Sequence, residues 1–278
     1  MKVLNQSSLL RLCLAGALVA ALPLAVPQFV RAQDAQDTTP YTWQFNYKKG
    51  DVSRYRVTGS LSGQLPNDSG DLSIVLKSVM KEEVKNTTDV GEADLGNTME
   101  SMEISVNGQP FPSNSDNQPT VTMTVNRNGL VLKRSAENNQ PGLEQIIALG
   151  TLLSNMPVPP MPVKIGDTWK TELDNPLVEG KKVTLTSKLV GKEKVAGIDT
   201  LKVRVETSVP TKDGAEAKDT IKAEGVYNVD PQAGRLVRSS YDVTNLDMQA
   251  PFGTLKNMSQ KLTLIVPGVN DKEETAKP

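Results

Sequence analysis

Apolar and polar residues alternate along most of this chain, and this period of two is the feature that most constrains its fold. In the clearest run, Tyr41, Trp43, Phe45 and Tyr47 fall on one face while polar residues fall on the other. Because successive side chains of a β-strand point to opposite faces, such a run predicts a strand with one buried face. Further alternating runs lie at 57–65, 72–76, 102–106, 121–125, 201–209, 221–229 and 262–266. The chain is therefore predicted to be mainly β.

Turn sequences separate the alternating runs at short intervals. They include Asn107-Gly108, Asp213-Gly214, and the longer turns at 126–129 and 231–234. Asn-Gly and Asp-Gly pairs favour tight hairpins because both residues tolerate positive φ. Short hairpins between strands that each keep a polar face predict a long antiparallel meander, forming a curled sheet or an open barrel.

One segment departs from the period of two. Between about 142 and 155, apolar residues that include Ile146, Leu149 and Leu153 recur at the spacing of one helix face, which predicts a single central helix. Prolines follow it and cannot continue a helix, so an extended linker is expected after it. These prolines are Pro157, Pro159, Pro160 and Pro162.

The two halves of the chain on either side of this helix look alike. Lys49-Gly50-Asp51 has a counterpart in Ile165-Gly166-Asp167, and the segment 129–133 has one in 234–238. In each half, a Gly-Asp turn would open a meander that finishes in a hairpin turned at glycine. These matches predict two half-repeats, 41–140 and 157–268, within one β domain at 33–268.

Residues 1–32 are predicted to be an export signal. Lys2 and Arg11 are basic, an apolar run follows at 12–26, and Val30-Arg31-Ala32 supplies a cleavage site before Gln33. The apolar run is shorter than the roughly 20 residues that span a bilayer. We therefore expect an exported, periplasmic or extracellular protein with no transmembrane segment after cleavage.

The cysteine content and the C-terminus complete this picture. The chain's only cysteine, Cys13, lies inside the signal, so the exported chain contains no disulfide, which favours a bacterial source. The last residues, 269–278, are charged and end in proline, and they are predicted to be a disordered tail.

Composition excludes several kinds of chemistry. The chain contains no histidine, so neither a Ser-His-Asp triad nor a histidine-ligated zinc site can be assembled. A formal net charge of −1 argues against a nucleic-acid partner. We expect no metal site, no cofactor and no catalytic residue.

Two short motifs that suggest catalysis are better explained as parts of a strand and of a hairpin turn. Ser78 and Lys81 have the spacing of serine–lysine acyl enzymes, but they lie in an alternating run, where positions i and i+3 face opposite sides. Asp68-Ser69-Gly70 resembles an aspartic-protease turn, yet it occurs once and that chemistry needs two carboxylates. A pair of carboxylates that hydrolyses a glycosidic bond is kept as a remote alternative.

The aromatic run is the most informative feature for function, and two interpretations stay open. Its apolar face could anchor a solid core by burying large side chains. Alternatively, a curved sheet could leave this face lining a cavity for an acyl chain, with the helix as its lid. The candidate ligand-binding residues of the second interpretation are Tyr41, Trp43, Phe45, Tyr47, Ile146, Leu149 and Leu153.

Two segments in the second half carry a resemblance to a known family. Pro162–Trp169 contains the pattern V-K-x-G-D-x-W, and Val195–Val203 contains V-x-G-x-x-T. With these motifs the chain resembles a family of bacterial exported proteins of unknown function. More distantly, its export signal, long meander and helix resemble the half-barrel superfamily of outer-membrane lipoprotein carriers. That second resemblance implies an acyl chain bound in a concave apolar sheet.

Taken together, these features predict a non-enzymatic exported β protein. The favoured partner is a hydrophobic small molecule or lipid bound in the curved sheet. The alternative is a structural or interaction module of the cell envelope, with a solid core and a protein partner.

Overall fold

The computed structural model describes residues 38–66, 70–111, 120–136, 144–250 and 253–271. These residues belong to the compact unit Asp37–Pro278. The predicted signal peptide at 1–32, its cleavage site, Asp68-Ser69, and residues 272–278 of the predicted tail lie outside the described residues.

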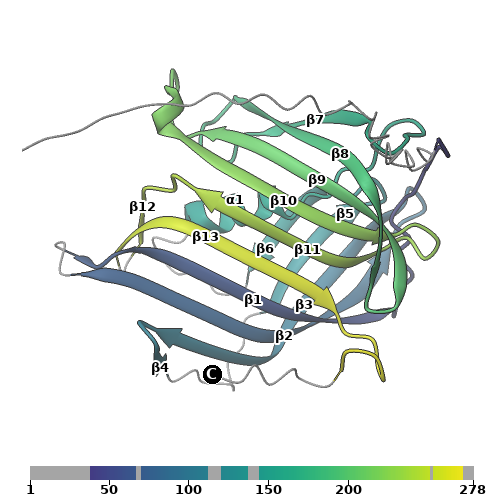
Figure 1. Cartoon of the computed structure of the whole chain (residues 1–278), viewed down its shortest axis with the longest axis horizontal. Coiled ribbons are helices and arrows are strands. Elements are labelled where there is room, and N and C mark those ends of the chain that lie inside the picture. Colours follow the sequence, from purple (N-terminus) through teal and green to yellow (C-terminus); the bar gives the residue numbers. More distant parts are fainter. Residues whose placement is uncertain (1–37, 67–69, 112–119, 137–143, 251–252, 272–278) are drawn as a thin grey trace, which may run out of the picture. The chain divides into compact units, whose positions relative to one another are not determined.

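Within the described residues, the strands form one 13-stranded antiparallel sheet, which confirms the predicted mainly β, curled meander (Figure 1). The main path through the sheet is β6-β5-β3-β2-β1-β13-β11-β10-β9-β8-β7, while β4 pairs with β3 and β12 pairs with β13. The strands are β1 (Val52–Gln64), β2 (Asp71–Thr87), β3 (Glu92–Val106), β4 (Gln109–Phe111), β5 (Thr120–Asn126), β6 (Val131–Ala136), β7 (Thr168–Asp174), β8 (Lys182–Val195), β9 (Ile198–Pro210), β10 (Thr220–Asp230), β11 (Arg235–Thr244), β12 (Met248–Ala250) and β13 (Gly253–Leu264).

The chain builds this sheet from its middle outward and then returns to the middle. The first half runs from β1 to the edge strand β6, and the helix α1 (Glu144–Leu153) follows, within the predicted span of about 142–155. The chain then reaches the opposite edge at β7, and the second half meanders back until β13 pairs with β1, with Val57 opposite Leu262. The two edge strands, β6 and β7, leave the sheet curled but open.

The two Gly-Asp turns make the same backbone contacts. The Gly50-Asp51 turn exchanges two hydrogen bonds with Val84 of β2, each of 2.9 Å. The Gly166-Asp167 turn exchanges the equivalent bonds, 2.7 and 3.0 Å, with Leu189 of β8. Each turn thus closes onto the second strand of its own half. The duplication of 41–140 and 157–268 stays a prediction, and the matching contacts of the two turns agree with it.

The aromatic segment 41–47 differs from its prediction. Its side chains alternate between buried and exposed as expected, but it is not a strand of the sheet. Its backbone instead bonds to separate loops: Tyr41 pairs with Val163, Phe45 N donates to Arg127 O (2.9 Å), and Asn46 N donates to Gly234 O (2.8 Å). Because these partners belong to different loops, no continuous ladder forms. We call this segment the strap, since it connects the β5–β6 and β10–β11 turns.

The hairpin glycines let the strap approach closely. A Cβ on Gly129 would lie 2.7 Å from Phe45 Cε2, and a Cβ on Gly234 would lie 2.4 Å from Gln44 O. Both residues also have positive φ, +75° and +64°, which glycine adopts without steric cost. Glycine is therefore required at these turns for space as well as for backbone conformation.

We expect Gly234→Ala to destabilise the protein far more than Gly214→Ala does. Gly214 has nearly the same φ, +66°, but a Cβ added there would have no neighbour within 4 Å. In the control, the left-handed backbone alone should lower the free energy of unfolding by about 1 kcal/mol. Gly234→Ala should lower it by about 2 kcal/mol more, because the strap must also move. Urea unfolding of both variants measures this difference. Equal losses would show that the strap does not pack against the turn.

The core has two main parts. In the first, Leu149 and Leu152 of α1 are buried against the inner face of the sheet, among Val183, Leu185, Val209, Ile221 and Val243. In the second, Trp43 and Phe45 of the strap are each 4% exposed, and Trp43 meets Trp169 edge-on at 5.9 Å between ring centroids. Burying such side chains contributes about 1.5–3 kcal/mol each, so the helix and the strap both anchor the curl.

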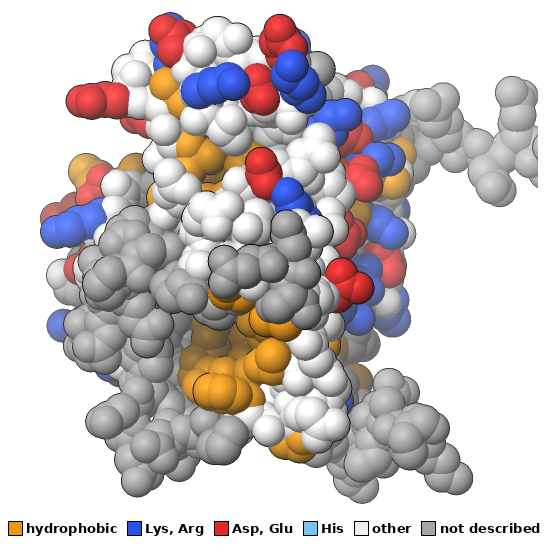
Figure 2. All heavy atoms as spheres, turned by 90° about the vertical axis from the view of Figure 1, so that its left-hand side faces the viewer, with side chains coloured by type: hydrophobic (Ala, Val, Ile, Leu, Met, Phe, Trp, Pro, Cys, Tyr) orange, Lys and Arg blue, Asp and Glu red, His pale blue; other side chains and the backbone are white. Residues whose placement is uncertain are grey.

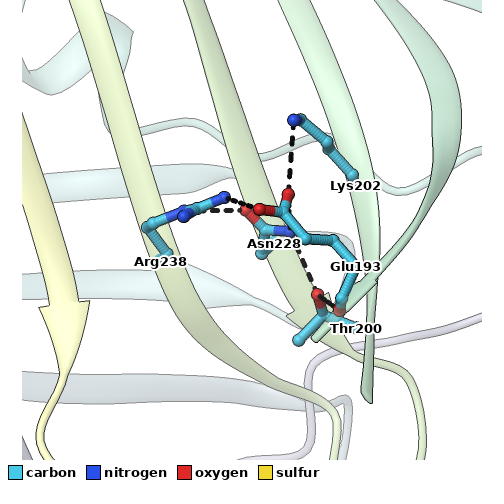
Figure 3. A network of polar contacts seen from close by, with 5 residues as sticks. All are labelled: Glu193, Thr200, Lys202, Asn228 and Arg238. Atoms are coloured by element: carbon cyan, nitrogen blue, oxygen red, sulfur yellow. Dashed lines mark hydrogen bonds and ion pairs between the residues drawn. The ribbon is translucent and has the colours of Figure 1, made fainter. Parts of the chain in front are cut away.

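A polar network ties four strands together on the outer face of the second half (Figure 3). Asn228 is fully buried, and its Nδ2 donates to Thr200 Oγ1 (3.0 Å) while its Oδ1 accepts from Arg238 Nε (3.1 Å). Arg238 and Lys202 both form ion pairs with Glu193, at 2.8 and 3.3 Å. These contacts hold the pKa of Glu193 below its usual value, chiefly through the Arg238 hydrogen bond. The network fixes how β8, β9, β10 and β11 lie against one another.

Asn228→Ala should cost about 2–3 kcal/mol of stability, because it removes two hydrogen bonds made by a fully buried side chain. Asn257→Ala is the matched control: Asn257 is exposed on β13 and donates one long bond, 3.3 Å, to Ser62 Oγ. The control should cost less than about 0.5 kcal/mol. Chemical denaturation of both variants gives the two values, and a small loss for Asn228→Ala would mean that the network does not stabilise the sheet.

The end of the described chain is ordered further than predicted. Asn270 Nδ2 donates to Leu264 O (2.8 Å), and Asn270 O accepts from Arg56 Nη2 (3.1 Å). The first residues of the predicted tail at 269–278 are therefore a turn that is held against β13 and β1.

Candidate functional site

The inner face of the curled sheet holds a cavity of about 270 Å³ that is partly open to solvent. Strands of both halves and α1 contribute to its wall. Its apolar lining is rich in methionine, whose flexible side chain adapts to ligands of irregular shape. The apolar residues that line it include Met80, Met99, Val121, Met123, Leu153, Met156 and Leu262.

A second cavity, of about 470 Å³, adjoins the first beneath the strap. Phe45 and Tyr47 of the strap line it, together with Val84 and Leu95 of the sheet. The two cavities share lining residues, so they are neighbouring compartments of one interior. The shared residues are Glu82, Met123, Ser154, Met156 and Leu236.

Glu82 is the acidic side chain at the boundary between the two cavities. Burial in this apolar interior raises the pKa of its carboxyl from 4.5 to about 7, although a hydrogen bond from Tyr55 opposes the shift. Burial also raises the pKa values of the nearby Tyr47 and Tyr55 hydroxyls. The interior thus keeps Glu82 close to half protonated near neutral pH.

Other polar groups line the first cavity. Asn97 is 6% exposed, and its Oδ1 has no hydrogen-bond partner in the part of the chain that the structure describes. Arg134 donates from Nη1 to Thr151 Oγ1 (3.2 Å), and burial lowers the pKa of its guanidinium. Tyr241 donates its hydroxyl hydrogen to Gln260 Oε1. A mostly apolar wall with a few polar groups is the usual construction of a small-molecule site.

The structure separates the residues that the sequence grouped as ligand-binding. Leu153 lines the first cavity, and Phe45 and Tyr47 line the second. Trp43 packs against Trp169. Leu149 is fully buried in the part of the core that contains α1, and Ile146 packs against that same part. Tyr41 pairs with Val163, and the Lys192 ammonium lies 5.7 Å from its ring centroid.

Sequence reasoning missed Glu82 and Asn97, although a signal for both was present. The alternation in β2 places Leu72, Ser78 and Glu82 on the same inner face, and that in β3 places Asn97 in line with Leu95. A polar residue at an apolar position of an alternating strand points into the interior. Such positions mark either a satisfied core group or a binding site.

Figure 2 shows hydrophobic side chains gathered in a hollow at the end of the sheet where β12 lies. Partly buried apolar residues from this end pack against the part of the core that contains α1, among them Leu61, Ile74 and Met258. The inner wall of the curl is therefore apolar beyond the two cavities.

No protein-family model and no curated protein sequence matches this chain. Among solved structures, lipovitellin, studied for its lipid–protein interactions, aligns with 84% of the chain at 11% identity and a TM-score of 0.44. The chain spans only 27% of the length of that protein.

Two bacterial structures align over nearly their whole length. A protein from Bacteroides fragilis, described as exported and YmcC-like in fold, aligns with 81% of this chain and 100% of its own, at 13% identity and a TM-score of 0.32. A protein from Parabacteroides distasonis, described as a lipoprotein, aligns with 80% of this chain and 97% of its own, at 12% identity and a TM-score of 0.30. We infer the function of this chain from its own cavity and not from these alignments.

In the part of the chain that the structure describes, α1 and the other helical turns fall short of the length and apolar character that a membrane-spanning helix needs.

Proposed function

We propose that this chain is an exported, non-catalytic bacterial protein that binds a hydrophobic or lipid-like ligand inside its curled sheet. The observation that carries the proposal is the apolar, methionine-rich cavity of about 270 Å³ next to the compartment of about 470 Å³. Ligand sites in proteins usually measure about 300–1,000 Å³ and are mostly apolar. The two compartments together provide this volume.

The strap and α1 act as walls in this proposal. Trp43 and Leu149 are buried in protein, so they hold the strap and the helix in place and do not themselves touch the ligand. Phe45, Tyr47 and Leu153 present their side chains to the two compartments. The solid-core alternative accounts for Trp43, but it leaves the lining of Met80, Met99 and Met123 without a role.

The arrangement of carboxylates supports binding in preference to catalysis. Hydrolysis by paired carboxylates needs two such groups facing each other across the scissile bond. Among the described residues, Glu82 lines both compartments, while Asp51 and Glu224, the other acidic residues that border them, are exposed. We therefore assign Glu82 to binding.

Fluorescence titration with phenylnaphthylamine, which emits strongly in an apolar site, tests this proposal. We expect saturable binding of one probe per chain and full displacement by dodecanol. A signal that rises linearly without saturation, or that dodecanol does not reduce, would contradict an internal ligand site and favour the solid-core alternative.

A further inference from the structure

Glu82 and Asn97 form an adjacent pair on the inner wall of the sheet. They are direct partners in the register of β2 against β3, and both line the first cavity. Side chains directly opposite each other on one face of an antiparallel pair have Cβ atoms about 4.5–5.5 Å apart. One small group in the cavity can therefore contact both side chains.

Both members of the pair offer hydrogen-bond acceptors to the cavity. Asn97 is buried, and its Oδ1 lacks a donor among the described residues. The ionised carboxylate of Glu82 only accepts hydrogen bonds. A buried acceptor without a donor costs free energy, so a site that leaves Asn97 Oδ1 facing a cavity is completed by a ligand that donates.

The surroundings of the pair are apolar. Met80 precedes Glu82 on the inner face of β2, and Met99 and Val121 lie next to Asn97 on β3 and β5. A chain of methylene groups can pack on these side chains while the polar end meets the two acceptors. The low polarity of this wall is also what raises the pKa of Glu82 to about 7.

We propose that the ligand is an amphiphile whose head group donates hydrogen bonds, a hydroxyl or an ammonium, and that Glu82 and Asn97 hold this head. The apolar chain then extends among the methionines toward Leu153. This inference rests on the proposed function, because it names the ligand class of the same cavity.

Three probes with the same chain and different heads test the inference: dodecanol, dodecylamine and dodecanoate. Each displaces phenylnaphthylamine from the wild-type protein at about pH 8, where Glu82 is mostly ionised. A hydrogen bond to a charged group contributes enough for about a tenfold difference in affinity, so dodecanol or dodecylamine should bind at least about tenfold more tightly than dodecanoate. Tighter dodecylamine identifies an ammonium head, and tighter dodecanol identifies a hydroxyl head.

The same titration separates the two proposals. If dodecanoate binds as tightly as the other two or more tightly, the head-group inference is overturned, while the ligand site stands. That outcome would point to Arg134, which lines the same cavity. If none of the three displaces the probe, the proposed function fails as well.

Variants of the pair provide a second test. In Glu82→Gln and in Asn97→Leu, the preference for dodecanol or dodecylamine over dodecanoate should fall to about twofold or less. Glu82→Gln removes the negative charge of the pair, and Asn97→Leu removes its amide acceptor. Glu83→Gln, which removes a carboxylate from the outer face of the same strand, should keep the preference. A preference that survives both changes to the pair overturns the inference. If either variant fails to fold, the wild-type comparison of the three heads decides alone.

Discussion

Val121→Trp should abolish ligand uptake while the protein stays folded. Val121 lies on β5 opposite Asn97, and its partly exposed side chain borders the cavity of about 270 Å³. An indole at this position would occupy the space that the ligand needs. Because the added side chain enters an existing hollow, the stability should change by less than about 1.5 kcal/mol, whereas overpacking a filled core would cost more.

The matched control is Val75→Trp. Val75 lies on the outer face of β2, is 37% exposed, and faces away from the cavity. The affinity for phenylnaphthylamine should fall at least about a hundredfold in Val121→Trp and by less than about twofold in Val75→Trp. Unchanged uptake in Val121→Trp would place the ligand elsewhere. Equal losses in both variants would indicate general damage to the sheet.

The second large effect is a loss of stability with rising pH that depends on Glu82. Its pKa is about 7 in the folded chain, against 4.5 ordinarily, so between these values the folded state binds more protons than the unfolded state. Stability therefore falls as the pH rises from about 4.5 to about 7, and stays low above that range. Each pH unit in this window is worth about 1.4 kcal/mol, so the total loss is roughly 3 kcal/mol.

Urea unfolding at about pH 5 and about pH 8 measures this loss. The Glu82→Gln variant does not titrate, so it should lose roughly 3 kcal/mol less than wild type between the two conditions. Glu83→Gln is the control: Glu83 lies on the outer face, where Lys85 and Lys81 lower its pKa, so its contribution changes only in more acidic solution. If Glu82→Gln and wild type show the same pH dependence, Glu82 is not buried in an apolar interior.

Much of the fold could be predicted from the apolar–polar alternation and the turn sequences, because both depend only on residues that are close in the chain. The alternation at 121–125 and 201–209 corresponds to strands β5 and β9, and the helical spacing at about 142–155 corresponds to α1. The strap shows where local reasoning fails. Its alternation correctly predicts that Trp43 and Phe45 are buried. Strand pairing, however, depends on which backbone lies alongside, and within the described residues no strand of the sheet runs beside the strap.

The candidate site was less predictable for a related reason. A residue such as Leu149 has the same sequence signature whether it fills a core or lines a cavity, and the difference depends on packing between distant elements. Glu82 and Asn97 come together only through the register of β2 against β3. The sequence places each on an inner face, but their pairing and the cavity next to them are properties of the assembled sheet.

A ligand that lies inside the curl can be located by photo-crosslinking. Dodecanol carrying a diazirine in its chain, bound in the dark and then irradiated, reacts with the residues that surround the chain. We expect adducts on the inner-face residues of β2, β3 and β5, chiefly Met80, Met99 and Met123, and none in the Val121→Trp variant. Adducts on outward residues such as Val75, or along the proline segment 157–162, would contradict it.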